Sequence, residues 1–341
     1  MPIRFVPLFP LIIAVAFLFP ESGSVIYGQS ELRVTQNRSL RESRNTPATN
    51  QAAEMLREMH DARKSIPWDK LPPAAQTKVR SVVAGTPLFH RMTQQKIYAD
   101  PEIYNFLLCN PDFVIDFWEH LGATQLSLQV VRKDNYILKE SSGTSAAVEV
   151  LYQSSEVCIV YAKGEYRGPL LAKTYHGGVV LVLRTHFTRD ETNEPIIVCN
   201  LDTFVQINSL GADMLAKLFF TSLTKVAEGN FEVTMAFVGQ VSRAAVRNGS
   251  ALKSAVEQIP TVRNDVYNEF CDVVDRSALR FAHRNQPTAL SWGSPRPDIA
   301  RFDDSSRFYG SASSEVLEEL RVPRRLEASL FEYAPPRLPV H

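Results

Sequence analysis

The side chains best suited to acid–base chemistry fall on strand-like segments in the middle of the chain. They alternate with apolar residues, chiefly in residues 177–188 and 195–208, and they are Glu149, Arg184, His186, Asn200 and Asp202. A histidine beside a carboxylate and an arginine could serve as a base, an orienting group and an anion clamp. The alternation, however, puts this polar set on the face opposite the aliphatic one, where antiparallel sheets commonly meet water. We therefore expect a solvated cross-strand charge cluster.

Other motifs that could do chemistry are weak. His176 stands beside two glycines, which a turn explains equally well, and the hydroxyl-rich residues 141–145 lack the lysine of a phosphate loop. The sequence contains no G-x-S-x-G, H-E-x-x-H or G-x-G-x-x-G motif. The four cysteines form neither a C-x-x-C pair nor a zinc-like spacing with the seven histidines. The sequence thus predicts no catalytic residue, no metal and no cofactor, and it favours a protein that is not an enzyme.

Composition excludes one class of partner. The 341 residues are 45% hydrophobic and 22% charged, which is ordinary for a globular protein. Lysines and arginines number 37, as do aspartates and glutamates, so the formal net charge is zero. A chain without a basic field is a poor partner for nucleic acid, and we expect no binding to it.

The amino terminus reads as an export signal. Arg4 precedes an uncharged apolar stretch at residues 5–19, which is the length of a signal-peptide core and short of a spanning helix. We expect residues 1–29 to be removed and the mature protein to be periplasmic or extracellular; an uncleaved anchor is the alternative. Disulfides are permitted in that compartment, yet Cys158 and Cys199 lie within apolar strand patterns and favour buried free thiols.

Composition then divides the remaining chain. Residues 30–66 read as a polar linker with a short amphipathic helix at 50–64, and residues 67–250 read as the folded domain. Residues 251–284 are expected to form additional helices. Residues 285–341, rich in proline, serine and arginine, predict a poorly ordered tail with one possible helix at 314–320.

Within the domain, short helices follow a first strand. Residues 89–99 predict that strand, and Asp100 is placed to cap a helix that starts at Pro101. Asn110-Pro111 ends this helix and starts a second one, whose apolar side includes Trp118, so we expect Trp118 to be buried against the sheet. Gly122 ends the second helix.

The apolar period then changes from helical to two. Alternating runs separated by turns predict six antiparallel strands between residues 126 and 208. No segment of helical length separates them, which excludes a parallel sheet. A long helical stripe follows from Ser209 to about Arg247, interrupted at Gly229-Asn230, and residues 262–283 predict one more helix.

This element order resembles the START-like group of polyketide cyclases, lipid-transfer domains and pollen allergens. The resemblance covers residues 89–247 and rests on the Asp-Pro-Glu helix start, the Asn-Pro break before Trp118, the six strands and the final helix. It implies an α+β helix-grip fold, in which a curved antiparallel sheet wraps a long C-terminal helix, with two short helices after the first strand. The chain also resembles an uncharacterised group of exported bacterial proteins, which implies no activity.

The helix-grip resemblance implies a cavity between the sheet and the long helix. Alternation places an aliphatic face toward the helix, so the predicted ligand-binding residues are apolar. They are Tyr152, Leu181, Leu183, Phe187, Val205 and Ile207 from the sheet and Leu215, Phe219 and Leu223 from the helix. The alternative is that these side chains fill the space as a close-packed core.

These patterns together predict an exported protein that binds an apolar or lipid-like small molecule without transforming it. Two alternatives stay open. One is an enzyme of polyketide-cyclase type with polar residues inside the cavity. The other is an envelope protein-interaction module whose core is filled.

Overall fold

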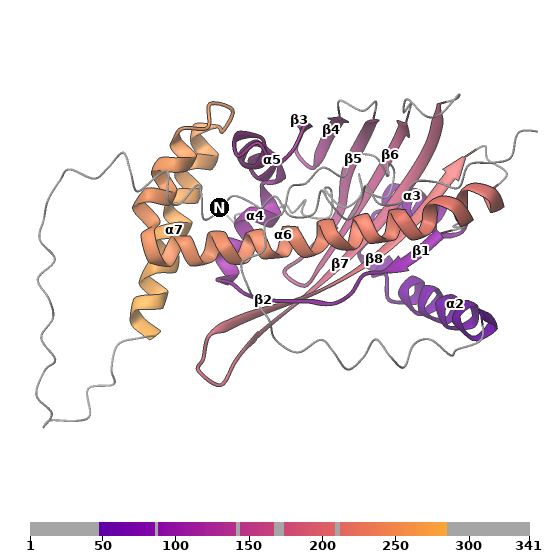
Figure 1. Cartoon of the computed structure of the whole chain (residues 1–341), viewed down its shortest axis with the longest axis horizontal. Helices are drawn as coiled ribbons and strands as arrows, with labels where there is room; N and C mark the ends of the chain where they lie inside the picture. Colours follow the sequence, from indigo (N-terminus) through magenta and orange to yellow (C-terminus); the bar gives the residue numbers. More distant parts are fainter. Residues whose placement is uncertain (1–47, 86–87, 141–143, 167–173, 209–211, 285–341) are drawn as a thin grey trace, which may run out of the picture.

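The computed structural model describes residues 48–85, 88–140, 144–166, 174–208 and 212–284 (Figure 1). The predicted export signal, residues 30–47 of the polar linker and the C-terminal tail, with its possible helix at 314–320, lie outside these residues. The described helices before the sheet are α2 (Ala48–Lys64), the 3₁₀ turn η1 (Trp68–Lys70) and α3 (Pro73–Val83).

Two short strands and two short helices come next. The strands are β1 (Leu88–Arg91) and β2 (Gln95–Tyr98), and the helices are α4 (Pro101–Cys109) and α5 (Pro111–His120). Asp100 caps α4 as predicted, because its carboxylate accepts hydrogen bonds from the backbone N–H groups of Glu102 and Ile103. Asn110-Pro111 separates the two helices.

The predicted single strand at residues 89–99 is wrong in detail, since it is divided into β1 and β2. Both segments pair antiparallel with the same strand, β8. Between them, the backbone N–H of Thr93 donates to the Glu228 carboxylate at 3.0 and 3.1 Å. This side-chain acceptor replaces a sheet partner and lets the chain leave the ladder for a few residues.

The six predicted strands are present, and all are antiparallel to their neighbours. In chain order they are β3 (Leu126–Arg132), β4 (Asn135–Glu140), β5 (Thr144–Gln153), β6 (Val157–Tyr166), β7 (Tyr175–Arg189) and β8 (Pro195–Asn208). The sheet order is β1-β8-β7-β6-β5-β4-β3, with β2 also on β8. Sequential hairpins account for this order, because each of the six strands pairs with the next.

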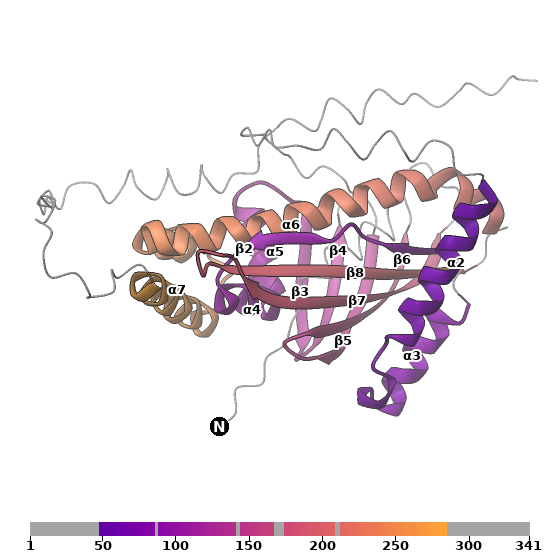
Figure 2. The same cartoon turned by 90° about the horizontal axis from the view of Figure 1, so that it is seen from below.

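A long helix with a kink, α6 (Ala212–Glu257), crosses one side of the sheet, and α7 (Asn264–Arg284) packs near its C-terminal end (Figures 1 and 2). The predicted interruption at Gly229-Asn230 is wrong, because α6 runs through it. The non-helical residue is Asn248 instead, with φ −150° and ψ 61°. Its side chain accepts from the N–H of Ala251 and restarts the helix as an internal cap.

Close packing against α7 explains why the next residue, Gly249, is a glycine. A Cβ at this position would lie 2.9 Å from the Val274 side chain of α7. Glycine therefore lets α7 approach α6 closely at the bend.

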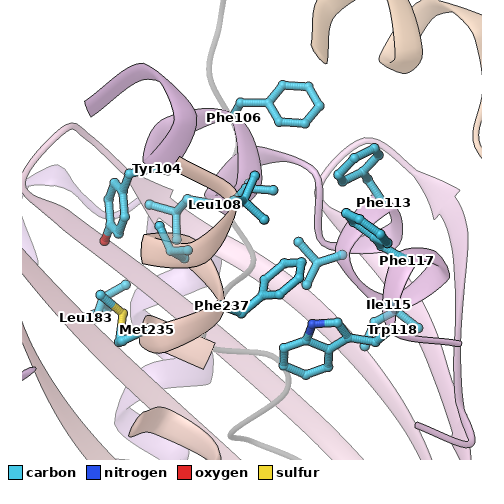
Figure 3. Packing of buried hydrophobic residues seen from close by; sticks show 14 of the residues in the cluster. Tyr104, Phe106, Leu108, Phe113, Ile115, Phe117, Trp118, Leu183, Met235 and Phe237 are labelled. Carbon is cyan, nitrogen blue, oxygen red and sulfur yellow. The ribbon is translucent and has the colours of Figure 1, made fainter. Parts of the chain in front are cut away.

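The fold is an α+β helix grip, as predicted, with two hydrophobic clusters. The inner cluster lies between the inner face of the sheet and α4, α5, α6 and α7; it includes Tyr104, Phe106, Trp118, Phe237 and Phe270 (Figure 3). The outer cluster lies between the outer face and α2 and α3; it comprises Ala62, Ile66, Leu71, Ala75, Val79, Val82, Val83, Phe89, Ile159, Val180, Val182 and Phe204. Each face of the sheet is thus covered by helices.

None of the helices in the described ranges combines the length and the apolar character that crossing a membrane requires.

Candidate functional site

The predicted sheet residues of the cavity mostly reach the inner face. Leu181, Leu183 and Val205 are buried in the inner cluster, and Phe187 and Ile207 pack against it while partly exposed. Alternation along β7 and β8 accounts for this arrangement, since all five occupy odd positions on neighbouring antiparallel strands. The helix residues Leu215, Phe219 and Leu223 belong to α6, but their side chains lie outside the described part of the structure.

Tyr152 is the exception, since it packs against the outer cluster. The reason is a β-bulge in β5, where the register with β6 shifts between Val150 and Tyr152. Ala146 and Val148 face inward before the bulge, whereas both Leu151 and Tyr152 contact the outer cluster after it. A bulge inserts an extra residue and reverses the alternation, which period-two reasoning cannot anticipate.

The size of the side chains on the inner face changes along the sheet. At the end where β8 leads into α6, cross-strand neighbours with small side chains form one row: Ala146, Gly164 and Gly177, with Ile207 beyond them. Ala162 lies in the next row. At the opposite end, the rings of Phe106, Phe113 and Phe270 pack with centroids 5.0 to 5.3 Å apart. Bulky aromatic rings therefore pack at one end of the inner face, and small residues lie at the other, where a Cβ on Gly164 would lie 2.7 Å from the Ala146 side chain.

Two polar clusters border the inner face, and sequence reasoning missed both. In the first, the Tyr104 hydroxyl lies 2.6 Å from Thr185 Oγ1 and 3.4 Å from Cys199 Sγ. Burial raises the pKa of the Tyr104 hydroxyl well above its usual range and raises the pKa of Cys199 to about 11. Both groups are therefore protonated at neutral pH, which suits hydrogen bonding and does not suit nucleophilic chemistry.

The second cluster joins α6 to the sheet. His90 Nε2 lies 2.9 Å from Glu228 Oε1, and the same carboxylate accepts from the N–H of Thr93. Opposite His90 on β8 is Thr203, whose hydroxyl is buried and lacks a hydrogen-bond partner in the described part of the chain. The α4 residue Tyr104 and the α6 residue Glu228 carried no sequence signal, because only the folded chain brings their elements to these strands.

The outer polar set is not the solvated cluster that we expected. Asp202 is buried, and its carboxylate accepts from Arg91 Nε at 2.7 Å and from Arg184 Nη1 at 2.7 Å. Helix α2 and the turn after it cover this position, where Arg184 also donates to Ser65 Oγ. The prediction failed because it treated the outer face as open to water.

The other members of the polar set are spread over the outer face. Glu149 forms an ion pair with Lys78 of α3, and Asn200 accepts a hydrogen bond from Gln94 at 2.9 Å. His186 is exposed, as its predicted outward direction requires. His176 lies 3.7 Å from Glu165 with both side chains more than half exposed. The set is therefore not gathered into a catalytic arrangement.

Tyr152 lines a separate hollow of about 980 Å³ at the end of the sheet. The hollow lies among η1, α4, the β3–β4 turn and the end of β5, and its charged groups are Lys70, Lys133 and Asp134. Burial raises the pKa of the Asp134 carboxyl, and one oxygen of that carboxyl is buried without a partner among the described residues. Lys70 Nζ lies 5.9 Å from the centre of the Tyr152 ring.

The structure also shows where the cysteines lie and whether potential metal ligands gather. Cys158 and Cys199 are buried in the inner cluster as predicted, and none of the four cysteines forms a disulfide in the described part of the chain. Within the described ranges, no three histidine, cysteine, aspartate or glutamate side chains gather closely enough to hold a metal ion.

Comparison with solved structures finds chains of similar fold. A conserved protein from Geobacillus kaustophilus is 16% identical, covers 42% of this chain and 95% of its own, and has a TM-score of 0.29. A hypothetical protein from Helicobacter pylori is 8% identical, with coverages of 45% and 89% and a TM-score of 0.31. The protein Ara h 8.0201 is 10% identical, with coverages of 42% and 98% and a TM-score of 0.26.

These TM-scores are too low for the likenesses to carry any argument about ligand or activity. No protein-family model and no curated protein matches the sequence. The helix-grip assignment therefore stands on the chain's own topology.

Proposed function

We propose that the protein binds an apolar or lipid-like small molecule, without transforming it, between the inner face of the sheet and the first turns of α6. The observation that carries this proposal is the row of small residues, Ala146, Gly164 and Gly177, on the inner face. At Gly164 the missing side chain lets β5 approach closely, since a Cβ there would lie 2.7 Å from the Ala146 side chain. The row lacks the bulky rings that pack at the other end of the inner face, which favours a ligand over this end. The first turns of α6 start beside the row, because β8 ends at Asn208 and α6 begins at Ala212.

The surroundings of the row support an apolar ligand. The next inner-face residues are Ala162, Val179 and Val205, all aliphatic and buried. Thr203 lies on the same face of β8 as Ile207, and its buried hydroxyl lacks a hydrogen-bond partner among the described residues. A polar group at one end of a ligand would supply that partner. The sequence prediction assigns the other wall of the site to Leu215, Phe219 and Leu223 of α6.

Binding is favoured over catalysis by the chemistry of the inner face. Its hydroxyl and thiol cluster at Tyr104 and Cys199 is held protonated at neutral pH by burial. The charged side chains that sequence analysis singled out lie on the outer face, away from the proposed ligand. Together with the predicted export signal, these features support the proposal of a carrier or binding protein outside the cytoplasm.

The test uses a neutral probe, N-phenyl-1-naphthylamine, whose fluorescence rises in an apolar site. Wild-type protein should enhance the signal saturably. Ile207→Trp, at the partly exposed end of the row, should weaken binding at least tenfold, because the indole occupies the proposed ligand volume. Gln206→Trp is the matched control, since it adds the same ring one residue earlier on the outer face.

Circular dichroism must show that both variants are folded. Absence of probe binding to folded wild-type protein would overturn the proposal and favour the interaction module with a filled core. Equal weakening by Ile207→Trp and Gln206→Trp would place the ligand elsewhere than on the inner face.

A further inference from the structure

The outer side of the molecule carries a second hollow that the proposed function does not use. It is open, has a volume of about 500 Å³, and lies between the end of α2, η1 and the end of α3. Four of its lining residues are His60, Arg63, Lys64 and Arg80, and its apolar part includes Trp68. The outer cluster lies beneath it, since Val83 belongs to both.

Four of the seven residues that line the hollow are basic, and most of its exposed surface is apolar. No carboxylate side chain lines it, and Arg63, Lys64 and Arg80 form no ion pair with any residue that the structure describes. Asp61 lies 3.8 Å from His60 of the lining, with both side chains largely exposed. The pKa of Arg91 is raised mainly by its hydrogen bond to Asp202 and to a smaller extent by Glu58 and Asp61.

Helix capping does not account for the basic residues at the end of α2. Cations near a helix C-terminus often serve its last carbonyl groups. Here the backbone N–H of Ser65 donates to Asp61 O at 3.0 Å, and the hydroxyl of Ser65 donates to Ala62 O at 2.9 Å. Trp68 Nε1 donates to Arg63 O at 3.1 Å. Three of the last four carbonyl groups of α2 therefore have these donors.

Arg63 also carries a hydrogen-bond donor that is not satisfied within the described structure. Its Nε is buried and has no acceptor in the described part of the chain. A buried N–H of a charged group without an acceptor is costly, and structures usually provide a partner. An anion in the hollow would supply one.

The guanidinium group of Arg80 is held in position beside the hollow. Its guanidinium carbon lies 4.4 Å from the centre of the Trp68 ring. Stacking on an aromatic ring uses the face of the guanidinium and leaves its N–H edges free for hydrogen bonds. A pre-positioned guanidinium loses less conformational entropy when it binds an oxyanion.

We propose that this hollow binds a phosphate group, with Arg63 and Arg80 as its hydrogen-bond donors and Lys64 as an additional positive charge. Guanidinium groups match the geometry of phosphate oxygens through paired hydrogen bonds. The apolar part of the lining favours a phosphate that carries an organic substituent over the bare ion. The site is on the opposite side of the sheet from the apolar site and is independent of it.

Isothermal titration calorimetry of the full chain with phenyl phosphate tests the proposal. We expect saturable binding that weakens at least tenfold in Arg63→Gln and in Arg80→Gln. Arg80→Lys should not restore it, because lysine keeps the charge but lacks the planar group that stacks on Trp68. Lys139→Gln is the matched control, since it removes one exposed positive charge from β4 and leaves the hollow unchanged.

Parallel titrations identify the source of the phosphate. Inorganic phosphate that binds as tightly as phenyl phosphate supports a free-phosphate site. Tighter binding of phenyl phosphate supports an organic phosphate, and binding only to vesicles of phosphatidic acid in phosphatidylcholine supports a lipid headgroup. Failure of all three probes to bind, or equal weakening by Lys139→Gln, would overturn the proposal. N-phenyl-1-naphthylamine binding should stay unchanged in every one of these variants.

Discussion

Trp118 lies at the aromatic end of the inner cluster, where its ring centroid is 5.5 Å from that of Phe237 (Figure 3). The side chain is 1% exposed, as the apolar side of its helix predicts. Its indole Nε1 is buried without a hydrogen-bond partner in the described residues. The residue thus contributes a large buried surface and carries one unsatisfied donor.

We expect Trp118→Ala to lower the free energy of unfolding by about 3 to 5 kcal/mol, because it removes a buried ring and leaves a cavity. Trp118→Phe should cost less than half as much, since it keeps an aromatic ring and removes the unsatisfied N–H. Urea melts of the three proteins measure both effects. Superimposable melts for wild type and Trp118→Ala would contradict this packing.

The folded structure disfavours the ionised form of the Asp134 carboxyl. Burial raises the pKa of its carboxyl, so the folded chain holds the proton more tightly than the unfolded chain. The residue also has a φ of 64°, a left-handed conformation that asparagine tolerates. Replacement by asparagine should therefore remove the charge and keep the turn.

The pH dependence follows from linkage. A raised carboxyl pKa favours the folded state below the unfolded pKa, and this advantage is lost as pH rises through the folded pKa. Asp134→Asn should thus be more stable than wild type at neutral pH. The difference should vanish in acid, below the ordinary pKa of an aspartate. Denaturant melts at both pH values measure it, and a variant less stable at neutral pH would show that the ionised carboxylate has a stabilising partner.

At the scale of elements, Glu228 fixes α6 to the edge of the sheet. It accepts hydrogen bonds from the backbone of Thr93 and lies within hydrogen-bond distance of His90, so a single side chain links α6 to β1 and the break before β2. This link accounts for both the division of the first strand and the seating of α6.

Glu228→Ala should lower the free energy of unfolding by about 2 kcal/mol, because hydrogen bonds to a partly buried charged group are lost. Glu232→Ala is the matched control, since Glu232 is exposed one turn later on the same helix. Urea melts compare the two variants with wild type. A similar small loss in both would mean that helix propensity, and not the link to β1, sets the effect.

At the scale of the whole molecule, the predicted export signal implies that the chain is processed. We expect the mature protein to begin between Ser24 and Ser30 and to be found outside the cytoplasm. Amino-terminal sequencing of the protein from cell fractions measures this. An intact Met1 on cytoplasmic protein would remove export from the proposed function and would leave the ligand proposal to its own test.

The sequence by itself determined the helix-grip order and the aliphatic face of β7 and β8. Both follow from local periodicity and from turn residues such as Asp100 and Asn110-Pro111, whose effects act within a few residues. The same local periodicity correctly predicted that Trp118, Cys158 and Cys199 are buried.

Only the tertiary structure decided which polar groups are buried, where the long helix bends and which cations share a hollow. A bulge in β5 places Tyr152 on the outer face, and α2 covers Asp202. The long helix bends at Asn248, where α7 packs closely, and not at Gly229. The phosphate site likewise needs α2 and α3 side by side. These outcomes depend on contacts between segments distant in the chain, which the period of one segment does not contain.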